Sequence, residues 1–145
     1  MKVAAIQMPT VKDKMQNIRT AGTYMEKIKV EQPDFVILPE MFCCPYQTEN
    51  FPIYAEKEGG PSWQAMSDYA GKYHIYLIAG SMSEVDEAGN VYNTSYIFDR
   101  DGKQIGKHRK THLFDINVKN GQYFKESDTL TSGDHATVFD TEFGK

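Results

Sequence analysis

The chain has 145 residues, of which 40% are hydrophobic and 25% are charged, and its formal net charge is −4. This length suits one domain with its own core, and the acidic balance argues against nucleic-acid or membrane-surface binding, which needs basic patches. No apolar run is long enough to cross a bilayer, and the N-terminal apolar stretch is too short for a signal peptide. The two cysteines, Cys43 and Cys44, are neighbours, which excludes a disulfide framework and favours a reduced, cytoplasmic protein.

The first elements in the chain are two strands with a helix between them. Residues 2–8 and 34–38 are short apolar runs that are typical of buried strands. Between them, apolar residues recur at helical spacing over residues 13–31, and Asp13 with Gln16 fits a capping box at the start of this helix. Strand, helix and strand in this order predict a βαβ unit with a right-handed crossover.

The middle of the chain adds a second helix and a third strand. Residues 41–60 contain several prolines and glycines and are expected to be irregular. A helix is predicted from about Ser62, because the residues that follow place an apolar stripe at helical spacing. This stripe consists of Trp63, Met66, Ala70 and Tyr73. Residues 75–81 then form a third apolar strand, and the whole pattern predicts one α/β unit.

A hairpin is predicted over residues 91–98 and 103–108, because the sequence Asp-Arg-Asp-Gly at 99–102 favours a type I′ turn between two strands. Residues 110–135 are expected to be mostly irregular, and residues 136–140 are predicted to form a last strand. An apolar strand at a terminus would leave an unpaired edge, which natural proteins usually cover. This pattern suggests that the chain is incomplete.

Glu40 is the first candidate for a chemical role, since it directly follows the apolar strand at 34–38. The carboxyl ends of parallel strands are where α/β proteins place functional side chains. The plain alternative is a solvated acid in a loop. Apolar neighbours on both sides, Val36–Leu38 and Met41–Phe42, favour instead a carboxylate in an apolar pocket, which can act as a general base near neutral pH.

A second candidate region is the basic segment at residues 106–115, GKHRKTHLFD. In an extended chain Lys110 and His108 share one face and Arg109 takes the other. Such clusters are usually solvated, but a lysine that faces Glu40 would form a charge pair or stabilise a developing oxyanion. His108 and His112 have the spacing of zinc ligands on a helix, yet the segment does not fit a helix and lacks the internal glutamate, so no metal site is predicted.

These segments resemble the nitrilase, or carbon–nitrogen hydrolase, superfamily, and they are most similar to its omega-amidase-like Nit branch. The resemblance rests first on LPEMF at 38–42 together with HRKTHLFD at 108–115. VAAIQM at 3–8, GNVYNTSYIFDRDGK at 89–103 and FKESDTLTSGD at 124–134 follow the family's order. The resemblance implies an α/β fold, the four-layer α-β-β-α sandwich, of which this chain would supply roughly the N-terminal half.

The resemblance also implies an activity and its residues. The family's thiol amidohydrolases release ammonia from small carboxamides, here expected to be ω-amides of dicarboxylic acids. Glu40 matches the general base, Lys110 matches the lysine that stabilises the tetrahedral intermediate, and Glu126 matches a second glutamate that orients this lysine. No cofactor and no metal are expected. The expected partners are a small amide substrate and, in the full-length form, a second copy in a homodimer, but neither nucleic acid nor a membrane.

The nucleophile is the feature that departs from the family. Its cysteine lies in a Gly-x-Cys-x-Cys-Tyr-Asp element that would begin after Lys145, so residues 1–145 would be the N-terminal half of one domain, inactive alone. Cys43 and Cys44 stay open as substitute nucleophiles, although structural or pocket-lining roles are favoured. The sequence is also compatible with a non-catalytic half-domain, with a nitrilase or N-carbamoyl hydrolase of the same family, and with a flavodoxin-like binding module.

Overall fold

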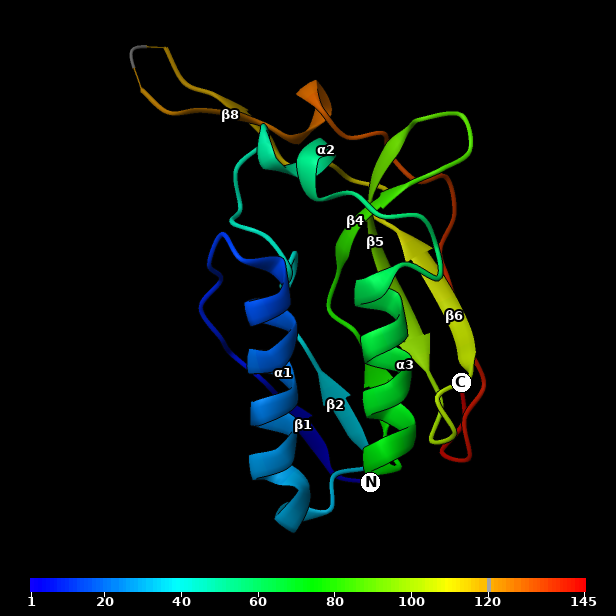
Figure 1. Ribbon diagram of the computed structural model, residues 1–145. Helices are drawn as coiled ribbons and strands as arrows, with labels where there is room; N and C mark the ends of the chain where they lie inside the picture. Colours follow the sequence, from blue (N-terminus) through cyan, green and yellow to red (C-terminus); the bar gives the residue numbers. More distant parts are fainter. Residues whose placement is uncertain (120) are drawn as a thin grey trace.

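The computed structural model describes residues 1–119 and 121–145. Its centre is a six-stranded sheet in the order β1-β2-β3-β5-β4, with β6 paired to the other edge of β5. The strands are β1 (Val3–Ala5), β2 (Phe35–Ile37), β3 (Tyr76–Ile78), β4 (Met82–Val85), β5 (Val91–Phe98) and β6 (Gln104–Arg109). The first three are parallel, and β5 runs antiparallel to β3, β4 and β6 (Figure 1).

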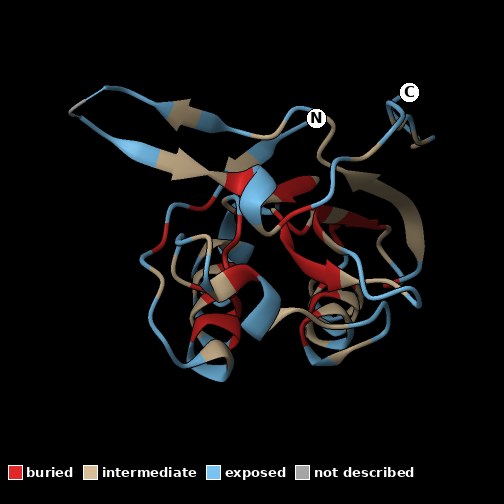
Figure 2. Cartoon of the chain, turned by 90° about the horizontal axis from the view of Figure 1, so that it is seen from above, coloured by how far each residue is buried: buried red, intermediate tan, exposed pale blue. Residues whose placement is uncertain are grey.

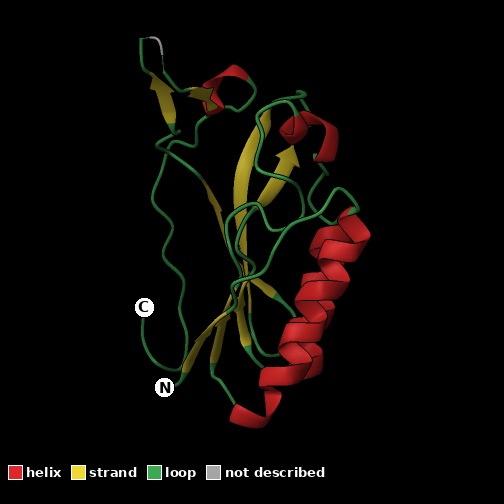
Figure 3. Ribbon diagram, turned by 90° about the vertical axis from the view of Figure 1, so that its left-hand side faces the viewer, coloured by secondary structure: helices red, strands yellow, loops and turns green. Residues whose placement is uncertain are grey.

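The helices α1 (Lys14–Ile28) and α3 (Pro61–Tyr73) cover one face of this sheet (Figure 3). Their apolar stripes pack with alternate strand residues in one core, which includes Met25, Met66, Val36 and Leu77. Asp13 accepts a hydrogen bond from the Gln16 N–H at 3.0 Å and caps α1 as predicted. The helix then continues into a short 3₁₀ turn, η1 (Lys29–Glu31). The predicted βαβ unit is therefore present.

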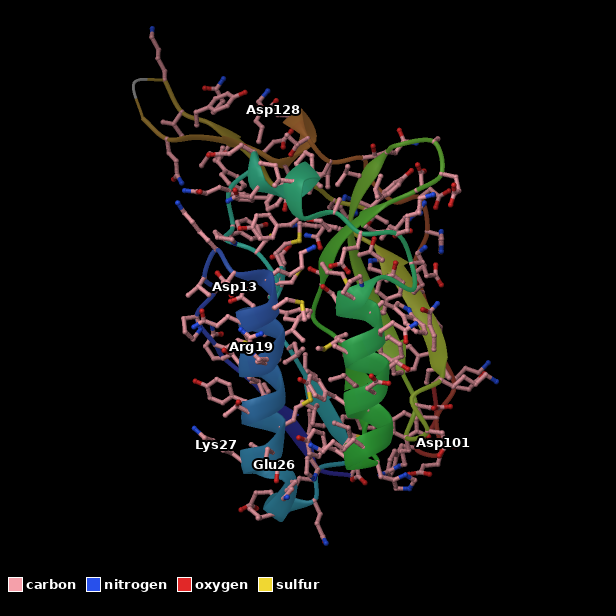
Figure 4. All side chains as sticks on the ribbon, viewed as in Figure 1. Asp13, Arg19, Glu26, Lys27, Asp101 and Asp128 are labelled. Atoms are coloured by element: carbon pink, nitrogen blue, oxygen red, sulfur yellow. The ribbon has the colours of Figure 1, made fainter. Side chains whose placement is uncertain are left out.

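Several charged residues of α1 lie on its outer side. In Figure 4, Arg19, Glu26 and Lys27 point away from the sheet, while Asp13 marks the start of the helix. The figure also labels Asp101 and Asp128, which lie at opposite ends of the molecule. Among the described residues, no helix combines the length and the apolar character that a membrane crossing needs.

The opposite face of the sheet is much less covered. Val3 on β1 is 50% exposed, and the C-terminal segment runs past this side of the sheet (Figure 3). Phe143 from that segment packs against Phe35 and Tyr76, with ring centroids 5.7 and 6.5 Å apart. One helical layer on one sheet corresponds to half of the four-layer sandwich expected from the sequence.

Two segments that were predicted to be irregular contain regular elements. Residues 41–60 contain a short helix, α2 (Asn50–Tyr54). Residues 110–135 contain a projecting hairpin of β7 (Asp115–Asn117) and β8 (Tyr123–Lys125), followed by the 3₁₀ helix η2 (Glu126–Asp128). In Figure 2 this hairpin is largely exposed, and its two strands are only three residues each, too short for a clear alternating pattern in the sequence.

The strand predicted at 136–140 is wrong. Val138 in this segment is 71% exposed, and the segment is held beside β6 by isolated bonds. The Gly133 N–H donates to the Lys110 carbonyl and the Thr137 hydroxyl donates to the Lys107 carbonyl, both at 2.8 Å. An alternating apolar pattern becomes a strand only where a partner edge continues the ladder, which this segment lacks.

The strand predicted at 75–81 is shorter than expected, since β3 ends at Ile78 and β4 begins at Met82. Gly80 has a φ of +53°, which bends the chain between them. The hairpin of β5 and β6 is present, but its type I′ turn is wrong because only Gly102 in the turn has a positive φ. The Asp99 carboxylate accepts from the N–H groups of Asp101 and Lys103, and this local bonding selects a different turn.

Candidate active site

Glu40 lies in a tight turn just after β2. The Met41 N–H donates to Ser81 Oγ at 3.0 Å, which ties this turn to the segment between β3 and β4. A Cβ on Gly80 would lie 2.1 Å from the Pro39 carbonyl oxygen, so the two backbones approach as closely as only glycine allows. Gly80 therefore positions the turn that carries Glu40 at the carboxyl ends of β2 and β3.

Lys110 lies between two carboxylates. It follows β6, and its N–H donates to the Asn93 carbonyl at 2.8 Å, which extends the pairing with β5. Its Nζ is 2.9 Å from Glu40 Oε1 and 2.9 Å from Glu126 Oε2. The structure thus brings together the three site residues predicted from sequence, although they are separated by 70 and 16 positions along the chain.

Glu126 is the buried member of the group, with 0% exposure. It begins η2, and its carboxylate accepts bonds from the Phe114 N–H and the Tyr46 hydroxyl, both at 2.5 Å, as well as from Lys110. Burial raises the pKa of Glu126, but these three donors outweigh burial and hold the pKa below the usual carboxyl range. Glu126 is therefore a fixed negative charge beneath Lys110.

The same contacts set the charge of Lys110. Burial lowers the pKa of its ammonium group, but the hydrogen bonds to Glu40 and Glu126 outweigh this effect, and the pKa lies above the usual lysine value. A lysine in this state remains cationic and does not act as a base at neutral pH. Its chemical use is to stabilise negative charge that develops beside it.

Glu40 and Lys110 open onto a cavity of about 280 Å³. Its lining consists of Glu40, Ser81, Asn93, Ser95, His108 and Lys110. The predicted apolar setting of Glu40 is wrong, since the side chain is 47% exposed and its bonded neighbours are polar. Met41 has a φ of +48°, and the chain turns there so that Met41 and Phe42 enter the core while Glu40 stays outside.

A larger cavity, of about 550 Å³, lies elsewhere. It is bounded by the ends of α1 and α3 and by Asp34 and Arg100. None of Glu40, Lys110 and Glu126 lines it. We therefore assign the site by the convergence of charged groups rather than by cavity size.

The two faces of β6 separate its basic residues as the sequence predicted. His108 and Lys110 line the smaller cavity. Arg109 points to the other face, where its guanidinium group bonds to Glu84 at 2.7 Å and lies over the Tyr92 ring. Because alternate residues of a strand face opposite sides, one short segment supplies both charge clusters.

The two cysteines are buried in the core. Cys43 belongs to the main core beneath α1, and Cys44 packs in a small cluster with Met41, Phe51 and Leu130. The contact with Cys44 and burial both raise the pKa of the Cys43 thiol well above its usual value. Neither cysteine lines the cavity beside Glu40, so the pocket-lining role is wrong and a packing role fits the positions.

Two contacts of the carboxylates were not found from sequence. Asn93 Nδ2 donates to Glu40 Oε1 at 2.8 Å, and the Tyr46 hydroxyl donates to Glu126 and lies 3.4 Å from Glu40. A signal for Asn93 existed, because it belongs to a run of three polar residues, Asn93 to Ser95, between the apolar and aromatic ends of β5. Tyr46 lies in an irregular segment where no periodicity indicates the direction of a side chain.

The chain resembles known proteins over almost its whole length. The model of the carbon–nitrogen hydrolase family matches residues 2–145. The chain belongs to the carbon–nitrogen hydrolase family. The chain is 45% identical to omega-amidase NIT3 of Saccharomyces cerevisiae over 152 residues, which cover 99% of this chain and 52% of that protein. It is 43% identical to omega-amidase NIT2 of Mus musculus over 144 residues, again covering 99% and 52%.

The fold of this carbon–nitrogen hydrolase also matches a solved structure. The crystal structure of Saccharomyces cerevisiae Nit3, a member of branch 10 of the nitrilase superfamily, has a TM-score of 0.87 at 40% identity, covering 99% of this chain and 52% of that chain. The resemblance to the nitrilase superfamily and its Nit branch is confirmed, and so is the fold class. The chain spans about half the length of the relatives it matches.

Proposed function

We propose that the protein hydrolyses the ω-amides of dicarboxylic acids and releases ammonia, with residues 1–145 supplying the base and the charge-stabilising groups. The observation that carries this proposal is the position of Lys110 Nζ, 2.9 Å from both Glu40 and Glu126 beside an open cavity. The substrate class is supported by the likeness to proteins named omega-amidase.

Each residue has a distinct task in the proposed reaction. Glu40 accepts the proton of a cysteine thiol, and the sulfur keeps the electron pair and attacks the amide carbon. Lys110 stabilises the oxyanion of the tetrahedral intermediate. Glu40 then returns its proton to the leaving nitrogen, and ammonia departs. In the second half, Glu40 takes a proton from water and the resulting hydroxide attacks the thioester carbon. The carbon–sulfur bond breaks, the electron pair leaves with the sulfur as a thiolate, and Glu40 returns its proton to that sulfur.

Glu126 has a supporting task in this scheme. It is buried, accepts bonds from the Phe114 N–H and Tyr46, and presents a fixed charge to Lys110. With two carboxylates and one ammonium group, the cluster carries a net charge of −1. The Glu126 carboxylate is occupied by its hydrogen bonds, so the partly exposed Glu40 is the carboxylate that can accept a proton.

We place the thiol of this mechanism outside residues 1–145, which we propose supply the N-terminal half of one domain. Cys43 and Cys44 are buried in the core and away from the cavity, so neither is placed to attack a substrate there. Residues 1–145 alone should therefore release no ammonia. Pairing of full-length copies as homodimers stays a prediction from the family resemblance.

Two measurements test the proposal. Sequencing the gene beyond the Lys145 codon should show a Gly-x-Cys-x-Cys-Tyr-Asp element within the next few codons. Ammonia release from succinamate and glutaramate should then be detected with the complete protein and be lost on Glu40→Gln, whereas Glu58→Gln, an exposed control, should keep it. Preferred turnover of a nitrile or an N-carbamoyl compound would overturn the substrate class, and turnover by residues 1–145 alone would return Cys43 or Cys44 as the nucleophile.

A further inference from the structure

Asn93 is a buried polar residue to which the roles above give no task. It lies on β5, which pairs with β4 on one edge and β6 on the other, and it is 3% exposed. Its side-chain Nδ2 donates to Glu40 Oε1 at 2.8 Å, and its carbonyl accepts the Lys110 N–H at 2.8 Å. One residue in the middle of the sheet therefore contacts both residues that would carry out the chemistry.

The bonds to Glu40 are uneven. Lys110 Nζ and Asn93 Nδ2 both donate to Oε1, at 2.9 and 2.8 Å. Tyr46 approaches the same oxygen at 3.4 Å, but its single hydroxyl proton is used in the 2.5 Å bond to Glu126. Across residues 1–119 and 121–145, no hydrogen bond to Oε2 is present. Because a carboxylate oxygen has two lone pairs, the two short bonds occupy Oε1 and leave Oε2 free.

Lys110 alone would not fix this arrangement. Its ammonium group is shared with Glu126, carries three rotatable donors and ends a flexible side chain. The last torsion of a glutamate is broad, so a carboxylate held by one flexible partner exchanges its two oxygens readily. The Asn93 amide is planar and extends from a strand that is paired on both edges, so it holds Oε1 in one orientation.

We propose that Asn93 is a positioning residue that holds Oε1 of Glu40 and thereby makes Oε2 the oxygen that exchanges protons. This inference rests on the proposed function. In the thiol step the S–H bond breaks, an O–H bond forms on Oε2 and the electron pair remains on sulfur. The Asn93 N–H stays on Oε1 throughout.

The test uses Asn93→Ala in the complete protein. We expect kcat for ω-amide hydrolysis to fall roughly 10- to 100-fold, since a hydrogen bond to a charged group is lost. KM should be nearly unchanged, because the substrate keeps its contacts. Asn93→Asp keeps the shape but places a like charge beside Glu40, and it should lower kcat further.

Thr94→Val is the matched control. Thr94 is adjacent on β5 and buried, and its hydroxyl donates to a different carboxylate, Glu84, at 2.7 Å. This variant should lose thermal stability and keep the kcat of the wild type per folded molecule. The proposal is overturned if Asn93→Ala shows no greater loss of kcat per folded molecule than Thr94→Val.

A second readout does not depend on activity. In the complete protein, the side-chain amide NMR signals of Asn93 should shift on Glu40→Gln. Amide signals that do not respond to this substitution would overturn the role of Asn93. If ω-amide turnover is absent while these signals shift, the substrate assignment fails and the contact between Asn93 and Glu40 stands.

Discussion

Two charge clusters lie on opposite faces of β6, and only one of them opens onto a cavity. On the face toward the helices, Glu84 accepts bonds from Arg109, Lys107 and Thr94. On the other face, Lys110 bonds to Glu40 and Glu126. The first, or enclosed, cluster has one buried carboxylate and two cations, of which Lys107 also bonds to the exposed Glu58. The second, or open, cluster has two carboxylates and one cation.

This difference shows why a perturbed carboxylate does not by itself mark an active site. Burial raises the pKa of both Glu84 and Glu126, but hydrogen bonds outweigh it in each, and both pKa values lie below the usual carboxyl range. Glu84 is nearly enclosed and fully paired, which describes a structural ion pair. Only the second cluster adds a further carboxylate, Glu40, that is partly exposed beside a cavity.

The largest expected effect comes from removing the shared cation of the open cluster. Lys110→Met should lower kcat roughly 10²- to 10³-fold, because the oxyanion loses its main charge partner. Ammonia release by the complete protein measures this effect. A folded Lys110→Met variant that keeps more than a small fraction of wild-type turnover would contradict a catalytic role for this cluster.

The corresponding change in the enclosed cluster should act on stability instead. Arg109→Met leaves Glu84 buried with only Lys107 as a cation, and we expect the free energy of unfolding to drop by roughly 3 kcal/mol. Denaturant unfolding of the complete protein measures this loss. Turnover per folded molecule should stay near that of the wild type, and a selective loss of turnover would place Arg109 in the chemistry.

Gly80→Ala tests the backbone that places Glu40. The added Cβ would meet the Pro39 carbonyl oxygen, and φ at this position is +53°. We expect a loss of stability of about 1–3 kcal/mol from backbone strain, together with lower turnover because the Glu40 turn is displaced. Gly89→Ala, at a turn with φ of +87° and open space around it, is the control that adds the φ strain without the collision. Equal turnover in the two variants would contradict the positioning role of Gly80.

The smallest expected effect is that of Tyr46→Phe, which keeps the ring and removes one donor from Glu126. At pH 7 the free energy of unfolding should fall by about 1.5 kcal/mol. The folded-state pKa of Glu126 is depressed, so the stability it contributes is present above the unfolded pKa of about 4.3 and is lost as pH falls through the folded value. The difference between Tyr46→Phe and the wild type should therefore shrink below about pH 4. Tyr123→Phe, which removes an exposed bond to Asp128, is the control.

The sequence was most informative where short motifs have a fixed position relative to a strand. Glu40 follows β2 and Lys110 follows β6, and the chain order predicted both strands. It was least informative where a side chain depends on distant backbone. The polar setting of Glu40 depends on the left-handed φ of Met41 and on the close approach of Gly80, and neither feature has a periodic signal.

Tertiary contacts explain the other differences. The apolar run at 136–140 has the composition of a strand but lacks a continuous partner, so only the Thr137 hydroxyl bonds to a carbonyl of β6, that of Lys107. Glu126 was identified only through the family resemblance, because its burial requires Tyr46 and Phe114 from segments that the sequence left irregular. Local pattern thus predicted the strands but not the bonds between loops.

We propose that the partly exposed Glu40 is the base and that the buried Glu84 is structural. Turnover per folded molecule of Glu40→Gln and Glu84→Gln in the complete protein tests it most directly, with the folded fraction of each measured by unfolding. Glu40→Gln should fold like the wild type and lose ammonia release, while Glu84→Gln should be less stable and keep its turnover per folded molecule. The opposite result, with turnover lost on Glu84→Gln and kept on Glu40→Gln, would contradict the account.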